Sequence, residues 1–119
     1  MPGGVKAEVR TYQMYVNGEW VDSKSNKIFP VIDPATEEVI AQVPDANADD
    51  VNRAVAAAKA AFESGTGAST TAQERGRVLF RLADKIRQNA AMLAELECRN
   101  TGKPIVEAEY DIADVSSWF

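Results

Sequence analysis

Hydrophobic and polar residues alternate along this 119-residue chain with two different periods, and the period changes near residue 44. Before that point, short apolar runs bounded by turn residues predict β-strands. After it, apolar residues recur every three or four positions, which is the spacing of one helix face. The pattern therefore predicts an α+β fold with short strands first and amphipathic helices last.

The region of strands opens with the strongest hairpin signal in the chain. Met14–Val16 and Glu19–Val21 flank Asn17 and Gly18, which accept the positive φ angles that a two-residue turn requires. Two further strands are predicted, at Ile28–Ile32 and Val39–Val43.

Two amphipathic helices are predicted next. The first begins at Asn47, which can cap it, and ends between residues 64 and 70, where Gly65 and Gly67 interrupt the pattern. The second begins with a capping box. Their apolar stripes need a surface to cover, so we expect exposed apolar area when the chain is alone. The capping box is Thr71 with Glu74, and the stripes are Val51, Val55 and Phe62, then Val78, Leu82 and Ile86.

The segment 100–119 carries the best functional signal. Gly102 stands where a third helix should end and Pro104 where a fourth should begin, which is the usual asymmetry of helix termini. In the fourth helix Asp111 and Asp114 share a face, with Trp118 one turn further along. A solvated helix face is the simplest interpretation of these carboxylates, and it stays open at this point.

Composition narrows the classes of function. The chain is 45% hydrophobic and 26% charged, with a net charge of −5 and a pI near 4.7. Such an acidic chain is not expected to bind nucleic acid or an anionic membrane surface, because its negative electrostatic field does not attract either of them. A cationic ligand or a protein partner fits this field better. No apolar stretch is long enough to span a bilayer and the first ten residues lack a secretion signal, so we expect a cytoplasmic location.

Residue chemistry offers little for catalysis. The chain has no histidine, so Cys98, its single cysteine, has no such base to activate it on its predicted helix. Lys103 follows Thr101 and Gly102, but the other residues that a phosphate loop requires are missing. We therefore predict no catalytic and no cofactor-binding residue within these 119 positions.

Four segments carry a resemblance to a known family. They are YVNGEWV (Tyr15–Val21), VIDPATEEVIAQVP (Val31–Pro44), DVNRAVAAA (Asp50–Ala58) and LECRNTGKP (Leu96–Pro104). In this order they resemble the amino-terminal part of the aldehyde dehydrogenase superfamily, and most of all its betaine aldehyde and aminoaldehyde dehydrogenases.

The first residues have no periodicity and include Pro2, Gly3 and Gly4, so residues 1–13 are predicted to form a flexible arm. The resemblance implies that residues 14–119 are the incomplete first portion of a dinucleotide-binding domain. Enzymes of this family oxidise aldehydes to carboxylic acids with NAD or NADP, through a cysteine thiohemiacetal and a glutamate base. Both residues are implied to lie beyond Phe119, so the chain alone is expected to be inactive. Its expected partner is the remainder of the enzyme, in a full-length homodimer or homotetramer.

The resemblance also assigns a role to the fourth predicted helix, which lines the mouth of the aldehyde tunnel in the family. Tyr110, Asp111 and Asp114 match this substrate entrance, and their pattern implies cationic substrates such as betaine aldehyde or 4-aminobutanal. Carboxylates attract an ammonium group and aromatic faces hold a quaternary one. Removing either carboxylate is expected to raise KM for such substrates.

Some members of the family hold K⁺ or Na⁺ through backbone carbonyls and an acidic side chain. The matching positions are Val31, Ile32 and Asn100. Asn100 stands where the family usually has aspartate, so an oxygen ligand is kept without its charge, and the site is expected to be weak or empty. The alternative is that Asn100 is an ordinary residue near a helix C-terminus.

A rival interpretation does not require the chain to be part of a longer polypeptide. The chain would then be a stand-alone helical module that binds another protein and has no catalytic activity. A sharp cooperative melting transition of the isolated chain would favour this module, whereas a broad transition with dye binding would favour an incomplete lobe.

Overall fold

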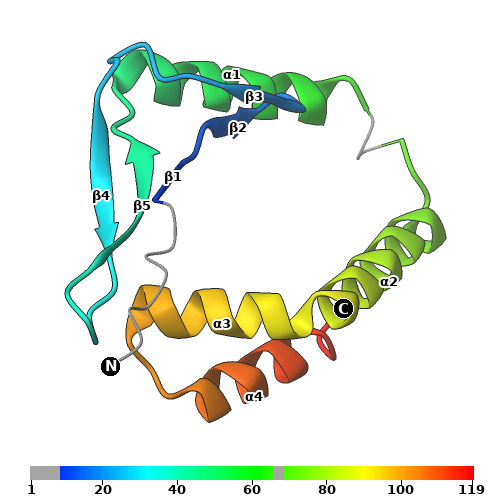
Figure 1. Cartoon of the computed structure of the whole chain (residues 1–119). Helices are drawn as coiled ribbons and strands as arrows, with labels where there is room; N and C mark the ends of the chain where they lie inside the picture. The colour runs from blue at the N-terminus through cyan, green and yellow to red at the C-terminus, as the bar shows by residue number, and fades with distance from the viewer. Residues whose placement is uncertain (1–8, 66–68) are drawn as a thin grey trace. The chain divides into compact units, whose positions relative to one another are not determined.

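The computed structural model describes residues 9–65 and 69–119, which form strands followed by helices, as the α+β prediction requires (Figure 1). The chain divides into two compact units, one up to Ala57 and one from Ala58, and each is described by itself. The strands are β1 (Arg10–Thr11), β2 (Met14–Val16), β3 (Glu19–Val21), β4 (Ile28–Ile32) and β5 (Val39–Pro44). The helices are α1 (Ala48–Glu63), α2 (Ala72–Gln88), α3 (Ala90–Thr101) and α4 (Ile105–Val115).

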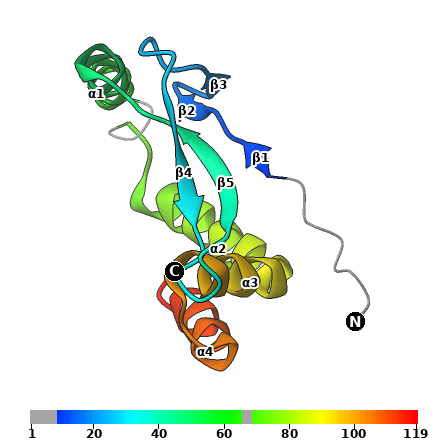
Figure 2. The same ribbon diagram turned by 60° about the vertical axis from the view of Figure 1, so that its left-hand side comes forward.

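The first unit holds a small sheet in which β5 lies between β1 and β4 (Figure 2). β4 pairs with β5 in the antiparallel sense, and β1 pairs with β5 in the parallel sense. Pro30 lies in β4, and its missing N–H is tolerated there because β4 is an edge strand. Both long strands were predicted, and β5 extends one residue beyond the predicted end, to Pro44.

The predicted hairpin is confirmed as the antiparallel pair β2–β3. Asn17 and Gly18 have φ angles of 55° and 82°, as a two-residue turn of this kind requires. Tyr15 and Trp20 face each other across the strands with their ring centroids 5.0 Å apart. This aromatic pair supports the register that the turn sets.

The predicted arm over residues 1–13 is wrong at Arg10–Thr11, which form β1. Thr11 pairs with Gln42, and the Thr11 hydroxyl also donates to Oε1 of Gln42 at 3.2 Å. A two-residue strand has no period of its own, and its partner lies 31 residues away, so no local pattern indicated it. Residues 1–8 lie outside the described residues.

Local capping signals predicted the helix boundaries well. Asn47 Oδ1 accepts the Asp50 N–H at 3.1 Å at the start of α1, and the capping box of Thr71 and Glu74 opens α2. Gly65 follows α1 with a φ of 81°, whereas the predicted break at Gly67 lies outside the described residues. Gly102 ends α3 in the left-handed conformation, with a φ of 74°. Pro104 is the N-cap of α4.

The second unit has a core of small residues. In the described part of the chain, the buried apolar residues are alanines, one in each of α2, α3 and α4: Ala83, Ala94 and Ala108. Small side chains let these helices approach closely, and Figure 1 shows α3 and α4 running side by side. Many of the large apolar side chains on these helices are exposed, among them Phe80 and Met92.

The expected exposure of the apolar stripes is confirmed. Phe62 on α1 is 75% exposed, Val55 is 61% exposed and Val78 on α2 is 53% exposed. Each of these side chains lies on the apolar face of an amphipathic helix, so apolar surface that such helices normally bury is exposed in the described part of the chain. No helix in the described part of the chain is long and apolar enough to cross a membrane.

Candidate functional site

All three predicted entrance residues lie on α4. Tyr110 and Asp114 are exposed, and Asp111 is half-buried. The expected shared face is formed in part: the Trp118 indole N–H donates to Oδ2 of Asp114 at 3.0 Å. This hydrogen bond joins a carboxylate to a ring that is itself 79% exposed.

Asp111 has a different partner, Lys103. The Lys103 ammonium lies 2.6 Å from Oε1 of Glu97 on α3 and 2.5 Å from Oδ2 of Asp111 on α4. The hydrogen bond from Lys103 to Asp111 does most to raise the pKa of the ammonium above its ordinary value, and the hydrogen bond to Glu97 acts in the same direction. Lys103 is therefore a fixed positive charge at the corner between the two helices.

Sequence reasoning missed this ion pair because Lys103 was considered only as part of a phosphate loop. Its partners stand six residues before it and eight residues after it, spacings that match neither a helix nor a strand. The signal that was present is a lysine between Gly102 and Pro104, where two helices meet at a short connection. A side chain there reaches both helices.

The predicted cation ligands fall in separate units. Val31 and Ile32 belong to β4, and the ladder with β5 shifts register between them, so that Ile32 pairs with Val39. The pairing passes from Ala41 to Val39 and skips Ile40 of β5, as in a β-bulge. Regular pairing is therefore interrupted beside the carbonyl groups that were expected to bind the cation. Asn100 is exposed in the last turn of α3. The cation site therefore stays a prediction.

Asp50 is a buried carboxylate whose role the sequence did not reveal. It is 2% exposed, and it accepts hydrogen bonds from the Ser23 hydroxyl at 2.6 Å, the Lys24 amide at 3.1 Å and the Asn47 amide at 3.2 Å. Arg53 lies 3.4 Å away. These contacts tie the segment after β3 to the start of α1.

The Ser23 hydroxyl does most to lower the pKa of Asp50 below its ordinary value, and the amides of Lys24 and Asn47 and the charge of Arg53 act in the same direction. Burial opposes them. Because the folded-state pKa is the lower one, the stabilisation is complete above about pH 4 and disappears as the pH falls through the folded-state pKa. Asp50 thus contributes to acid sensitivity of the first unit.

Asp50→Asn is expected to speed hydrogen exchange at the Lys24 and Asn47 amides about tenfold at neutral pH, because one of two acceptor oxygens is lost. Asp49→Asn is the matched control, since Asp49 is exposed in the same helical turn and loses the same charge. Exchange measured by NMR should differ little between wild type and Asp50→Asn in acid. Equal effects of the two variants at neutral pH would show that the hydrogen bonds of Asp50 are unimportant.

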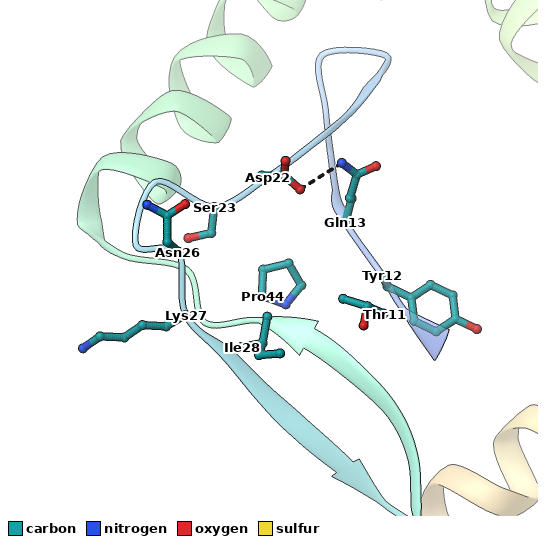
Figure 3. A pocket seen from close by; sticks show the side chains of 9 residues that line it. All are labelled: Thr11, Tyr12, Gln13, Asp22, Ser23, Asn26, Lys27, Ile28 and Pro44. Carbon is teal, nitrogen blue, oxygen red and sulfur yellow. Dashed lines mark hydrogen bonds between the residues drawn. The ribbon is translucent and has the colours of Figure 1, made fainter. Parts of the chain in front are cut away.

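A pocket of about 180 Å³ lies in the first unit (Figure 3). Pro44 and Ile28 form its apolar part, and Gln13 donates to Asp22 at 2.9 Å beside it. None of the predicted site residues lines this pocket. The lining residues are Thr11, Tyr12, Gln13, Asp22, Ser23, Asn26, Lys27, Ile28 and Pro44.

The Cys98 thiol donates to the Lys103 carbonyl at 3.0 Å and is half-buried. The absence of a catalytic role for Cys98 stays a prediction from the sequence. Over residues 9–65 and 69–119, no three side chains of the kinds that bind metals gather into a cluster.

The comparisons with known proteins extend over most of the chain. The model of the aldehyde dehydrogenase family matches residues 20–119. The mitochondrial aldehyde dehydrogenase family 2 member B4 of Arabidopsis thaliana is 47% identical over 97 residues, which are 82% of this chain and 18% of that protein.

Solved structures agree with this match. An NAD-dependent aldehyde dehydrogenase from Sinorhizobium meliloti superposes with a TM-score of 0.85 and 38% identity, over 91% of this chain and 22% of that one. Betaine aldehyde dehydrogenase from Staphylococcus aureus, in complex with NAD⁺, gives a TM-score of 0.85 and 38% identity over 87% of this chain and 21% of that one. The chain spans about a fifth of the length of these relatives. It belongs to the aldehyde dehydrogenase family and matches the first part of that fold.

Proposed function

We propose that this chain is the amino-terminal lobe of an NAD- or NADP-dependent aldehyde dehydrogenase that oxidises aldehydes to carboxylic acids. The observation that carries the proposal is the superposition on the Sinorhizobium meliloti enzyme over 91% of the chain. The remainder of the polypeptide would supply the catalytic and dinucleotide-binding residues. A cytoplasmic homodimer or homotetramer is the expected state of the whole enzyme.

The residues that the structure describes do not fit a dinucleotide. A pyrophosphate needs a glycine-rich turn between a strand and a helix, where backbone N–H groups can face it. In the described part of the chain, the connection between β5 and α1 is such a junction, but Asn47 and Asp50 cap each other there. Asp49 and Asp50 also place negative charge at that helix terminus. The bound cofactor would supply the redox chemistry elsewhere in the enzyme.

The substrates that we propose are aldehydes with a positive charge at the other end, such as betaine aldehyde and 4-aminobutanal. Tyr110, Asp111 and Asp114 on α4 support this choice, because carboxylates and aromatic faces attract ammonium groups. The similarity to the Staphylococcus aureus betaine aldehyde dehydrogenase also supports it.

The test is dinucleotide reduction by the intact polypeptide that carries these residues. We expect kcat/KM to be roughly ten- to a hundredfold higher for betaine aldehyde or 4-aminobutanal than for a neutral aldehyde of equal length. Absorbance at the reduced dinucleotide band measures it for both NAD and NADP. Oxidation of all aldehydes with equal kcat/KM would agree with the proposed dehydrogenase activity but would contradict the proposed preference for cationic substrates.

A monovalent cation at Val31, Ile32 and Asn100 is a further part of the proposal. We expect the intact enzyme to melt only slightly higher in KCl than in tetramethylammonium chloride, by about 1–3 °C, because Asn100 lacks a charge. Asn100→Asp should enlarge the difference. Calorimetry that finds the same melting temperature in both salts, for both proteins, would rule out the site.

A further inference from the structure

The turn of the β2–β3 hairpin carries a chemically reactive pair of residues. Asn17 is followed by Gly18, and no other asparagine of the sequence precedes a glycine. Both residues are exposed and have positive φ angles. The backbone nitrogen that follows an asparagine can attack the side-chain carbonyl carbon, and a glycine nitrogen is the least hindered because glycine has no Cβ. The turn therefore brings together the two groups that deamidation of asparagine requires.

The surroundings of the turn are open. A Cβ atom placed on Gly18 would have no heavy atom of the described residues within 4 Å, its chain neighbours aside. Val16 and Glu19 are the residues of the ladder nearest the turn, so Asn17 and Gly18 lie outside the strand pairing. Water and hydroxide can therefore reach both reacting groups.

Asn26 provides a matched comparison within the same unit. It is exposed, and its φ of 52° is close to the 55° of Asn17. The next backbone nitrogen, that of Lys27, donates to the Ser25 hydroxyl at 3.1 Å, and the Lys27 carbonyl accepts from the Asp45 N–H at 2.8 Å. The nitrogen that would attack at Asn26 is thus held by a hydrogen bond and crowded by a side chain. Asn26 is therefore a site of low reactivity.

The hairpin controls how freely Asn17 can react. β2 and β3 form a two-stranded sheet of their own, and such a hairpin is only marginally stable. Gln13 closes its base by donating to Asp22 at 2.9 Å (Figure 3). Nearer the turn, the rings of Tyr15 and Trp20 join the two strands with their centroids 5.0 Å apart. Opening of this aromatic contact frees the backbone of Asn17, so that the following nitrogen can align with the side-chain carbonyl.

We propose that Asn17 is a site of spontaneous deamidation, gated by opening of the hairpin at the Tyr15–Trp20 contact. Hydroxide removes the proton from the Gly18 nitrogen, which forms a bond to Cγ of Asn17. The Cγ–Nδ2 bond breaks, and ammonia leaves after taking a proton from water. Water then opens the cyclic imide at either carbonyl and gives aspartate or isoaspartate. The net change replaces ammonia with water and needs no oxidant or reductant.

The isoaspartate product does not fit the hairpin. Its backbone runs through the former side-chain carbonyl carbon, so the turn becomes longer by one methylene group. A two-residue turn sets the register of the strands, so the pairing of Tyr15 with Trp20 is lost. Deamidation of Asn17 is therefore a one-way change that opens the hairpin.

The test incubates the 119-residue chain in mildly alkaline buffer. Peptide mass mapping follows each asparagine, and labelling by isoaspartyl methyltransferase detects isoaspartate. Asn17 should convert about tenfold faster than Asn26. Trp20→Ser should speed the conversion of Asn17 about threefold and leave Asn26 unchanged, because it removes the aromatic contact. Phe80→Ser is the matched control, since Phe80 is an exposed ring on α2 and lies outside the hairpin.

Conversion of Asn17 no faster than that of Asn26 would overturn the proposed site. Equal conversion of Asn17 in the wild type and in Trp20→Ser would overturn the gate, and so would faster conversion of Asn26 in that variant. The comparison of the two asparagines in the wild type needs no variant, so it decides the site even if Trp20→Ser does not fold. NMR contacts between Tyr15 and Trp20 should disappear in the purified isoaspartate form, and their persistence would contradict the loss of register.

Discussion

Purified alone, the 119-residue chain is expected to show no aldehyde oxidation and no saturable binding of NAD or NADP. Cys98 donates its thiol hydrogen to the Lys103 carbonyl and has no histidine to activate it, so no nucleophile is prepared for a carbonyl carbon. The β5–α1 connection carries Asp49 and Asp50 where a dinucleotide would need backbone donors free of negative charge.

Isothermal titration calorimetry with NAD and NADP measures the binding, and absorbance of the reduced dinucleotide measures the reaction. The intact polypeptide is the positive control for both. We expect the intact polypeptide to oxidise aldehydes at its full rate and the isolated chain to show no reaction. The reason is that the whole chemical step is assigned to residues outside this chain. Saturable NAD binding by the isolated chain would show that a nucleotide site had been overlooked here.

The second large effect concerns the exposed apolar faces. The double variant Val55→Ser with Phe62→Ser should destabilise the intact enzyme by about 3–5 kcal/mol, because both side chains would be covered there by the rest of the polypeptide. In the isolated chain the same side chains are 61% and 75% exposed, so the variant should change stability by less than about 1 kcal/mol. Lys59→Ser, on the same helix, is the control with an exposed polar side chain.

Melting and dye fluorescence read out the effect in the isolated chain. We expect a broad transition and strong binding of a hydrophobic dye by the wild type, with clearly weaker binding by the double variant. A sharp transition without dye binding would instead support the stand-alone interaction module. Equal losses of stability in the two proteins would show that α1 is not covered by additional chain.

Features fixed by neighbouring residues could be predicted from the sequence. Asn17 and Gly18 supply the φ angles of the hairpin turn, and Thr71 and Glu74 bond each other across one helical turn. Gly102 adopts the left-handed conformation that ends α3. In each case the decisive interaction lies within a few residues, so the pattern and the structure depend on the same local chemistry.

Features that depend on distant partners could not be predicted in this way. Asp50 looked like a favourable charge at a helix N-terminus, but Ser23, its shortest hydrogen-bond partner, stands 27 residues earlier. Asp111 looked equivalent to Asp114 on a helical wheel, and only the position of Lys103 distinguishes them. Periodicity predicts on which face of a helix or strand a residue lies, but it does not predict which distant residue that side chain contacts.

Replacing the matching fifth of the Sinorhizobium meliloti enzyme with this chain tests the central claim most directly, because that claim is equivalence to the first lobe of the family fold. A second hybrid, with the corresponding segment of the Arabidopsis thaliana relative, controls for the effects of joining unlike chains. We predict that the hybrid with this chain reduces NAD with an aldehyde at a rate within about tenfold of the parent. A soluble hybrid that is inactive, while the Arabidopsis hybrid is active, would contradict the account.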